Sequence, residues 1–326
     1  MSLKSLFDED FIESKSVLII DCSNLAHRNL FIAKFELFKN KQEYELGNSS
    51  KLMLEDDMFV YWKYLMLNSL LSSIRQFKPN KVIIALDDRK NWRKEIYTEY
   101  KFNRKEKKDQ DIDWEKFYIY FNKLQDDLIK IFTNIVTLKV ENCEADDVIA
   151  ILSKELHNTH KITIISTDKD FLQLQQYKNV NQYNPIDKRD LKCIDPIREL
   201  QIKLLTGDSG DNIPCVKIKR IIKNIKKPPK TEYLGIGDKT AIKILDAGLD
   251  VYNDNQEFQD SYKMNTQLID FKFIPLHISE KIINKYKDYQ ISALNGKLVL
   301  DYFLTENFNN LYNSWQQYSN FVKQVL

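Results

Sequence analysis

The chain has 326 residues, of which 43% are hydrophobic and 12% aromatic, and its formal net charge is +2. This composition excludes a disordered chain, and the length suits one large domain or two ordinary ones. Acidic residues near the N-terminus exclude a secretory signal, and the absence of an 18-residue apolar run excludes a transmembrane helix. The four cysteines lack CxxC or Cys/His spacing, so we interpret them as free thiols.

Four short apolar runs predict buried strands at residues 16–21, 81–87, 134–140 and 161–166. They are rich in β-branched residues and alternate with helical patterns such as residues 54–77 and 144–156. Strands that alternate with helices predict an α/β domain over residues 1–206, with a mostly parallel central sheet flanked by helices.

A basic cluster follows the second predicted strand. Between Arg89 and Lys108 there are nine Lys or Arg and three Glu. The aromatic residues among them are Trp92, Tyr97, Tyr100 and Phe102. A solvated charged face is the ordinary alternative, but cations interleaved with rings are typical of single-strand binding. We therefore expect this segment to lie over the end of the sheet and to contact nucleic acid.

Helical patterns with polar breaks predict an all-helical second domain over residues 207–326. Its segment VKIKRIIKNIKKPPK (216–230) has seven Lys or Arg and no acid, and its isoleucines recur at helical spacing. This pattern predicts an amphipathic basic helix that contacts phosphates rather than a membrane surface. The glycines of LGIGDKTAIKIL (234–245) indicate backbone N–H groups that face a phosphate where a helix begins.

Acidic residues follow all four predicted strands. The carboxyl ends of parallel strands meet at one edge of a sheet, so we expect these side chains to lie together. Each of them alone has a structural alternative as a helix cap, and TGDSGDNIP (206–214) alone indicates a tight polar turn. The acids after the strands are Asp21, Asp87, Asp88, Glu144, Asp146, Asp168 and Asp170.

So many carboxylates at one rim repel one another unless cations neutralise them. Oxygen ligands without histidine or cysteine indicate a hard cation such as Mg²⁺, for which Mn²⁺ can substitute. Two such ions stabilise the attacking and leaving oxygens of an in-line phosphoryl displacement. The pattern predicts phosphodiester hydrolysis.

The motifs together resemble the structure-specific 5′-nucleases, or flap endonucleases, over nearly the whole chain. The matching stretches are Asp21, ALD ending at Asp87, WRKEIYTEYKFNR, EADD, STDKDF, TGDSGDNIP and GIGDKTA. LIDFKFIP (268–275) and the chain length are most similar to the T-even phage ribonuclease H members, which are not fused to a DNA polymerase. The resemblance implies a helical arch over about residues 89–116 and a helix-three-turn-helix motif in the C-terminal helical domain.

The resemblance also implies two Mg²⁺ ions. One would be held by Asp21, Asp87, Asp146 and Asp168. The other would be held by Asp170, Asp208 and Asp211, with Glu144 assisting through water. Asp88 and Asp147 are lesser candidates, because successive helix positions point about 100° apart.

Arg93 and Lys101 match the family's phosphate-contacting cations, which would stabilise charge on the scissile phosphate. The glycine pair would grip the duplex through phosphates, which positions DNA without reading its sequence. The residues expected to contact nucleic acid are Arg104, Lys105, Lys217, Lys219, Arg220, Lys223, Gly235, Gly237, Lys239 and Thr240.

The chain departs from the family pattern in the duplex-binding motif. The run IPGVxGIG is here IPCVK, with Cys215 in place of glycine, and GIG follows only after a seventeen-residue insertion at 218–234. We expect the basic insertion to extend the duplex contact. It also changes the turn in which the family binds a monovalent cation.

These features predict a Mg²⁺-dependent 5′-to-3′ exonuclease and flap endonuclease that removes RNA primers and flaps during lagging-strand replication. The expected substrates are branched or nicked duplex DNA and RNA–DNA hybrid. The alternatives are a non-catalytic structure-specific DNA-binding protein and another metal-dependent endoribonuclease. The complete carboxylate set argues against the first, and the arch and second domain argue against the second.

Further partners are suggested by the resemblance. SLKSLFDEDF (2–11) resembles peptides that dock on sliding clamps, with packing of Leu6 and Phe7 on their own domain as an equal alternative. A single-strand-binding protein is another expected partner, and we expect a monomer that binds no membrane. An intracellular location is expected, in the cytoplasm of a bacterial host if the chain is phage-encoded.

Overall fold

The computed structural model describes residues 15–41, 49–104, 109, 111–224 and 227–325, with the backbone alone for residues 38–41, 49–55, 220–224 and 227–232. The predicted clamp-docking peptide at residues 2–11 and the predicted contact residue Lys105 lie outside the described residues.

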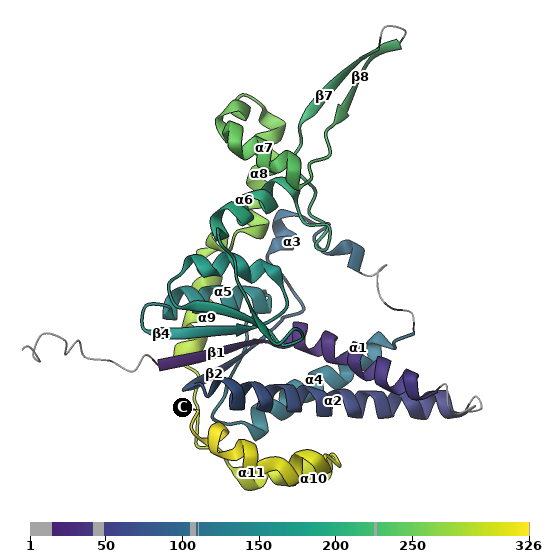
Figure 1. Ribbon diagram of the computed structural model, residues 1–326, viewed down its shortest axis with the longest axis vertical. Coiled ribbons are helices and arrows are strands. Elements are labelled where there is room, and N and C mark those ends of the chain that lie inside the picture. Colours follow the sequence, from purple (N-terminus) through teal and green to yellow (C-terminus); the bar gives the residue numbers. More distant parts are fainter. Residues whose placement is uncertain (1–14, 42–48, 105–108, 110, 225–226, 326) are drawn as a thin grey trace, which may run out of the picture.

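A six-stranded sheet in the order β3-β2-β1-β4-β5-β6 lies at the centre of the molecule (Figure 1). Its strands are β1 (Lys15–Asp21), β2 (Lys81–Leu86), β3 (Val136–Lys139), β4 (His160–Ile165), β5 (Val180–Asn184) and β6 (Arg189–Leu191). The first five are parallel and β6 is antiparallel to β5. The predicted α/β fold with a mostly parallel sheet is confirmed. Strands β5 and β6 were not predicted, because their sequences VNQYN and RDL contain no apolar run.

Helices cover both faces of the sheet, because alternate residues of a strand point to opposite sides. Leu18, Ile20 and Ile84 face one core, and Ile19 and Ile83 face the other. The helices on the first side are α1 (Cys22–Lys41), α2 (Ser49–Phe77), α4 (Trp114–Ile131), α10 (Gly296–Thr305) and α11 (Asn309–Lys323). Those on the second side are α5 (Ala145–Leu156), η3 (Lys169–Gln176), η5 (Phe271–Phe273) and α9 (Leu276–Lys287).

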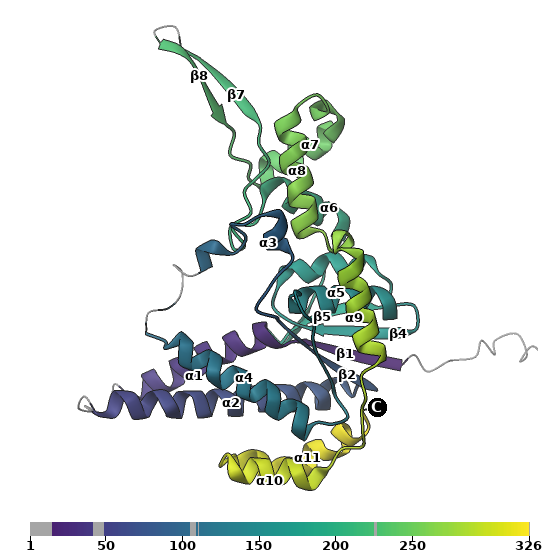
Figure 2. The same cartoon turned by 180° about the vertical axis from the view of Figure 1, so that it is seen from behind.

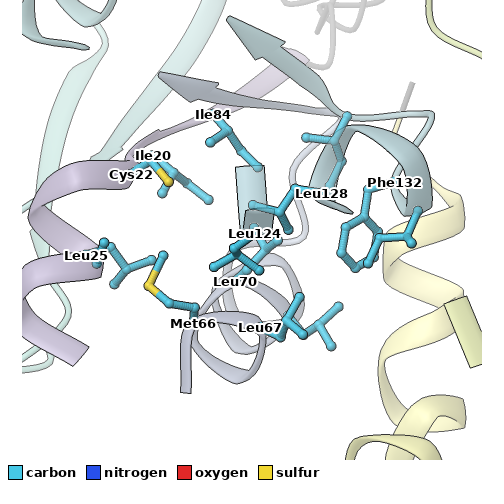
Figure 3. Packing of buried hydrophobic residues seen from close by; sticks show 14 of the residues in the cluster. Ile20, Cys22, Leu25, Met66, Leu67, Leu70, Ile84, Leu124, Leu128 and Phe132 are labelled. Carbon is cyan, nitrogen blue, oxygen red and sulfur yellow. The ribbon is translucent and has the colours of Figure 1, made fainter. Parts of the chain in front are cut away.

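The first core is a continuous apolar layer between the sheet and the long helices. Figure 3 shows Ile20 and Ile84 of the sheet above Met66, Leu70 and Leu124 of the helices. Helices α10 and α11 add Phe303 and Trp315 to the same core. The last helices of the chain therefore pack against its N-terminal half, although the domain boundary at residue 206 stays a prediction.

A further group of helical elements lies above the sheet (Figures 1 and 2). They are α3 (Arg93–Ile96), η2 (Phe102–Arg104), α6 (Pro196–Thr206), α7 (Asp238–Ala247), η4 (Leu249–Tyr252) and α8 (Gln256–Ile269). Within the described part of residues 89–116, helix is limited to α3 and η2 before α4 begins at Trp114. None of the described helices combines the length and apolar character needed to cross a bilayer.

The predicted amphipathic helix at residues 216–230 is wrong. The segment forms an antiparallel hairpin of β7 (Lys219–Asn224) and β8 (Lys227–Tyr233), which projects away from the body (Figures 1 and 2). Isoleucine is β-branched and therefore favours a strand, although the spacing of these isoleucines also matches the apolar stripe of a helix. Pro228 and Pro229 cannot continue a helix, and they lie where the strand register shifts, between the pairs Ile222–Lys230 and Asn224–Lys227.

Candidate active site

The sheet topology brings three predicted carboxylates to one edge. β1 lies between β2 and β4, and the residues at or just beyond the carboxyl ends of these strands are Asp21, Asp87 and Asp168. Asp21 is 4% exposed, and it accepts hydrogen bonds from Ser166 Oγ at 2.9 Å and from the Asn24 backbone N–H at 3.0 Å. The end of β4 is thus tied to the end of β1.

The first turn of α5 supplies two further carboxylates beside this edge. Asp87 accepts a hydrogen bond of 2.8 Å from the Ala145 backbone N–H, which holds the start of α5 against the end of β2. Glu144 is the N-cap of this helix and Asp146 follows in its first turn. Negative charge at this position is favoured by the helix dipole.

The two lesser candidates support the backbone instead. Asp147 is fully buried and accepts hydrogen bonds from the Glu144 backbone N–H at 3.0 Å and from Trp92 Nε1 at 3.1 Å. Asp88 accepts from the Asn142 backbone N–H at 3.0 Å. Both carboxylates hold the loop before α5 in place.

The acidic turn between α6 and the hairpin folds back on itself. Asp208 and Ile213 exchange two backbone hydrogen bonds of 2.8 Å, and Asp208 Oδ1 accepts from the Gly210 N–H at 2.7 Å. Gly207 has φ of 71°, and a Cβ there would lie 2.4 Å from the carbonyl oxygens of Ile213 and Pro214. This turn therefore requires glycine at position 207.

A lysine joins the acidic turn to the sheet. Lys203, near the end of α6, forms ion pairs with Asp170 and, at 2.8 Å, with Asp208. Asp170 in turn donates its backbone N–H to Asp168 Oδ1 at 2.9 Å. Sequence reasoning missed Lys203, because a cation in the last turn of a helix is ordinarily a partner of the helix dipole.

The basic segment meets the remaining carboxylates, Glu144 and Asp211. Lys101 Nζ forms an ion pair with Glu144 and lies 3.6 Å from Asp211 Oδ2, and Arg104 Nη2 lies 2.5 Å from Asp211 Oδ1. The hydroxyl of Tyr100 lies 2.9 Å from a carboxylate oxygen of each acid. The segment thus lies over the rim, as predicted from its place after β2.

Two of the predicted stacking rings are buried. Trp92 and Tyr100 are 2% and 3% exposed, so their prediction as base-stacking residues is wrong. The indole N–H of Trp92 donates a hydrogen bond to Asp147. The hydroxyl of Tyr100 contacts Glu144 and Asp211. A sequence pattern of alternating rings and cations does not show which rings face solvent.

Arg93 occupies a different environment from the one predicted. Its side chain is 3% exposed, and the guanidinium lies 2.8 Å from Asp147 Oδ1 and 3.3 Å from Glu144 Oε2, with Nε donating to the Leu268 carbonyl. In this position the guanidinium orients Glu144 and Asp147, and it presents almost no surface to a phosphate.

The protonation of the rim follows from burial and from these cations. Burial raises the pKa of Asp21 to about 7, and the charges of Asp87 and Asp168 add to the effect. Burial also raises the pKa of Asp170 to about 6, although Lys203 opposes it. Burial acts to raise the pKa of Glu144, but Lys101 and Arg93 outweigh it and lower that pKa to about 2.

The eight carboxylates form two halves of one cluster, which differ in whether lysine or arginine balances their charge. No ion pair within the described part of the chain reaches Asp21, Asp87, Asp146 or Asp168. Burial raises the pKa of Asp146 well above its usual value, with Lys101 opposing and Asp21 adding to the shift. By contrast, the other four carboxylates, Glu144, Asp170, Asp208 and Asp211, all pair with lysine or arginine.

The donor atoms of both halves are oxygens, which fits a hard divalent cation. Among the described residues, no three acidic, thiol or imidazole groups stand together as a ready-made ligand set. Lys101 Nζ lies between the carboxylates of Glu144 and Asp211, and Lys203 Nζ lies between those of Asp170 and Asp208. A cation held by these carboxylates would replace the lysines as the partner of their charge.

A cavity of about 670 Å³ connects the acidic turn with the predicted duplex-binding glycines. Its walls include Tyr97 and Asn103 of the basic segment, Ser209 of the turn, and Gly235 and Gly237. A Cβ at either glycine would meet no atom within 4 Å, so both leave open space beside the backbone. Gly237 is the N-cap of α7, whose first N–H groups have no side-chain cap.

The other predicted contact residues lie around this cavity and on the hairpin. Lys217 and Lys239 are exposed, Thr240 is half-buried, and Lys219 is exposed and pairs with Glu257 at 2.7 Å. Arg220 and Lys223 are in β7, where the backbone alone is described. Arg104 pairs with Asp211 at the rim, whereas the other described contact residues lie on or next to the hairpin and at the start of α7, away from the sheet (Figure 1).

Comparison with known proteins gives matches over both halves of the chain. Residues 16–202 match the family described as "5′-3′ exonuclease, N-terminal resolvase-like domain", and residues 196–318 match "T4 RNase H, C terminal". The chain is 30% identical to the Ribonuclease H of Enterobacteria phage T4, across 98% of this chain and 100% of that protein. It is 29% identical to a 5′-3′ exonuclease of Buchnera aphidicola subsp. Schizaphis graminum, across 63% of this chain and 67% of that protein.

Among solved structures, the D15 flap endonuclease of bacteriophage T5, in a complex with DNA and metal ions, has a TM-score of 0.57. The match covers 84% of this chain and 98% of that chain at 20% identity. The same protein co-crystallised with metal ions matches over the same shares with the same score. At this identity the likeness establishes a shared fold.

The geometry of the acidic turn predicts the effect of Gly207→Ala. The left-handed backbone and the 2.4 Å contacts of the added Cβ should lower the free energy of unfolding by roughly 1–3 kcal/mol. Gly235→Ala is the matched control, because its Cβ meets open space, and it should leave stability nearly unchanged. Denaturant unfolding of the two variants checks this; equal stabilities would show that the turn tolerates a side chain.

The raised pKa of Asp21 predicts a pH dependence in chelating buffer. The unfolded chain loses this proton near the ordinary value of 3.8, whereas the folded protein keeps it until about pH 7. The folded state binds more protons between these values, so this group lowers stability as pH rises through that window. Asp21→Asn should stabilise the protein by up to about 4 kcal/mol at pH 7.5 and little at pH 4. An equal effect of the substitution on stability at both pH values, measured by thermal unfolding, would show that burial does not raise the pKa of Asp21.

Proposed function

The chain belongs to the 5′-3′ exonuclease family and is a nuclease, and from this premise we propose a Mg²⁺-dependent 5′-to-3′ exonuclease and flap endonuclease. The predicted membership of the structure-specific 5′-nuclease family is confirmed by these matches. The observation that carries the proposal is the convergence of eight predicted carboxylates beneath a basic segment. That arrangement suits cation-assisted hydrolysis of a phosphodiester.

We propose two divalent cations at the rim. The residues that would hold the first are Asp21, Asp87, Asp146 and Asp168. Those that would hold the second are Asp170, Asp208 and Asp211, with Glu144 beside them. When bound, the cations would supply Lewis-acid stabilisation of the oxygens in an in-line displacement. The bound metal ions of the T5 structures support this proposal.

The lysines of the site would balance charge in the cation-free protein and act on the substrate in the loaded protein. Lys101 Nζ is held over the rim by Glu144 and by the hydrogen bond of its backbone N–H to the Asp211 carbonyl at 2.8 Å. With Glu144 and Asp211 neutralised, the Lys101 ammonium would be free to contact the scissile phosphate and would stabilise its developing charge. Arg93 remains a positioning residue for Glu144.

We propose that the substrates are nicked or branched DNA and RNA–DNA hybrid. The DNA complex of the T5 protein and the name of the T4 relative support these two classes. The duplex would lie along the glycine cavity, with its phosphates near Gly235 and Gly237 and the first N–H groups of α7. The basic hairpin would extend this contact, because a major groove admits a two-stranded ribbon.

The cellular role follows as a proposal from the same chemistry. An enzyme that cuts 5′ ends at nicks and flaps suits removal of RNA primers from lagging-strand fragments. A sliding clamp at residues 2–11, a single-strand-binding protein and a monomeric state remain predictions from the sequence.

Replacing a ligand of the first cation separates catalysis from binding. Asp146→Asn and Asp168→Asn should each lower cleavage of a labelled flap substrate by on the order of a thousandfold or more, because one oxygen charge at the cation is lost. DNA binding measured in chelator should survive. Asp254→Asn, an exposed aspartate far from the rim in the sequence, serves as the control. Unchanged turnover in either rim variant would refute the assignment.

Lys101→Ala tests the proposed phosphate contact. We expect kcat to fall by about 10²–10³-fold, because a charge aimed at the transition state is removed. Lys94→Ala is the control, since this lysine lies in the same basic segment but is exposed. Full kcat with a raised KM would make Lys101 a binding residue only, as single-turnover and steady-state kinetics would show.

A further inference from the structure

Helix α1 presents exposed phenylalanines on the face that begins at the carboxylate rim. Phe31 and Phe35 are 47% and 68% exposed, although the opposite face of the helix is fully buried. Together with Asn24 and Arg28 they follow the spacing i, i+4, i+7, i+11, which places all four on one line along the helix. We call this line the α1 face.

The α1 face is continuous with the candidate active site. The Asn24 side chain accepts hydrogen bonds from the Thr167 backbone N–H and hydroxyl at 3.1 and 3.0 Å, and the Asn24 N–H donates to Asp21. α1 begins directly after Asp21, so each later residue lies about 1.5 Å farther from the rim. Phe31 and Phe35 are therefore about 15 and 21 Å along the helix from the carboxylates.

Aromatic and basic groups of neighbouring elements flank the α1 face. His27 stacks on Trp114 at 5.9 Å and lies edge-on to Tyr118 at 6.5 Å, and helices α1 and α4 lie side by side in both views (Figures 1 and 2). Burial raises the pKa of Tyr118, and the charges of Arg104 and Asp87 act on it in opposite directions. Tyr118 therefore lies within electrostatic range of both Arg104 of the basic segment and Asp87 of the rim.

Helix α1 itself carries two cations near the phenylalanines in sequence. Lys34, which precedes Phe35, forms ion pairs with Asp109 at 2.6 Å and Asp111 at 3.2 Å. Arg28 donates through Nη2 to the Pro185 carbonyl at 3.3 Å, while its buried Nε has no hydrogen-bond partner within the described part of the chain. This half-buried guanidinium places a positive charge on the α1 face itself.

We propose that the α1 face binds the single-stranded 5′ segment of the substrate, with bases stacked on Phe31 and Phe35 and phosphates near Arg28 and Lys34. Exposed rings combined with cations are the usual platform for single strands. This inference rests on the proposed function, because it places the strand relative to the scissile phosphate. It adds a site for the part of the substrate that is cut off.

The distances set a length for the bound segment. At about 3.4 Å per stacked nucleotide, Phe31 and Phe35 lie beside the bases about four to six nucleotides from the rim. A flap of one or two nucleotides is too short to reach either ring. A flap of eight nucleotides reaches both.

The test measures DNA binding in chelator by fluorescence anisotropy, with flaps of zero, two, four, six and eight nucleotides. Phe31→Ala and Phe35→Ala should each weaken binding of the eight-nucleotide flap by at least about fivefold. Neither should change binding of nicked duplex or of the two-nucleotide flap. Phe273→Ala is the matched control, because this phenylalanine is 51% exposed on η5 and lies outside the α1 face.

A second arm distinguishes stacking from apolar contact. Phe35→Tyr should restore tight binding, whereas Phe35→Leu should not. The fluorescence of 2-aminopurine five nucleotides into the flap should be quenched by the wild-type protein and recover with the double alanine variant. Unfolding midpoints of all variants should match the wild type, since both rings are exposed.

Several results would overturn the inference. An equal loss of affinity for nicked duplex would show that the α1 face contacts the duplex. Unchanged flap binding by the double alanine variant would show that the face does not bind DNA, and a protein partner would then be its occupant. A leucine as good as tyrosine would exclude stacking. The proposed function is tested in a separate experiment, and it fails if no substrate is cleaved in the presence of Mg²⁺. The binding measurements contain no divalent cation, so the two failures can be distinguished.

Discussion

Repulsion among carboxylates at one edge of a parallel sheet is the constraint on which the rest of this structure depends. Asp21, Asp87 and Asp168 are brought together by strand order, and burial increases the cost of the Asp21 charge. The surrounding residues lower that cost in two ways. Some carboxylates accept hydrogen bonds from backbone N–H groups, as Asp87 does from Ala145, and others pair with lysine or arginine. Where neither suffices, the pKa rises, as it does for Asp21 and Asp146.

The basic partners of the cluster come from segments that also have a place for the substrate. Lys101 belongs to the segment over the rim, and Lys203 belongs to the helix that leads into the acidic turn. From Lys203 the chain continues through Asp208 and Asp211 to the hairpin and then to Gly235. One continuous stretch therefore links the charge balance of the site to the proposed duplex grip. Such continuity would set the spacing between a bound duplex and the scissile phosphate, because the stretch includes a tight turn that requires glycine at position 207.

The sequence predicted the elements whose local pattern admits one solution. The four apolar strands and the acids that follow them were recognisable, because a short β-branched run between helical patterns favours a buried strand. Strands β5 and β6 escaped prediction, since VNQYN and RDL have no apolar pattern and are held by pairing with neighbours. The hairpin at Lys219–Tyr233 was mistaken for a helix, because spaced isoleucines suit both forms until the two prolines and the pairing partner are considered.

The sequence by itself determined the fold class, the family and the set of acids and cations from which a site can be built. Only the tertiary structure decided how those groups are used. In the folded protein Arg93, Trp92 and Tyr100 are buried, although the sequence pattern predicted that they contact the substrate. Lys203 lies between two predicted cation ligands. The physical reason is that burial and ion pairing depend on segments distant in the chain. A residue's chemistry is local, but its exposure and its partner are set by the packing of the whole molecule.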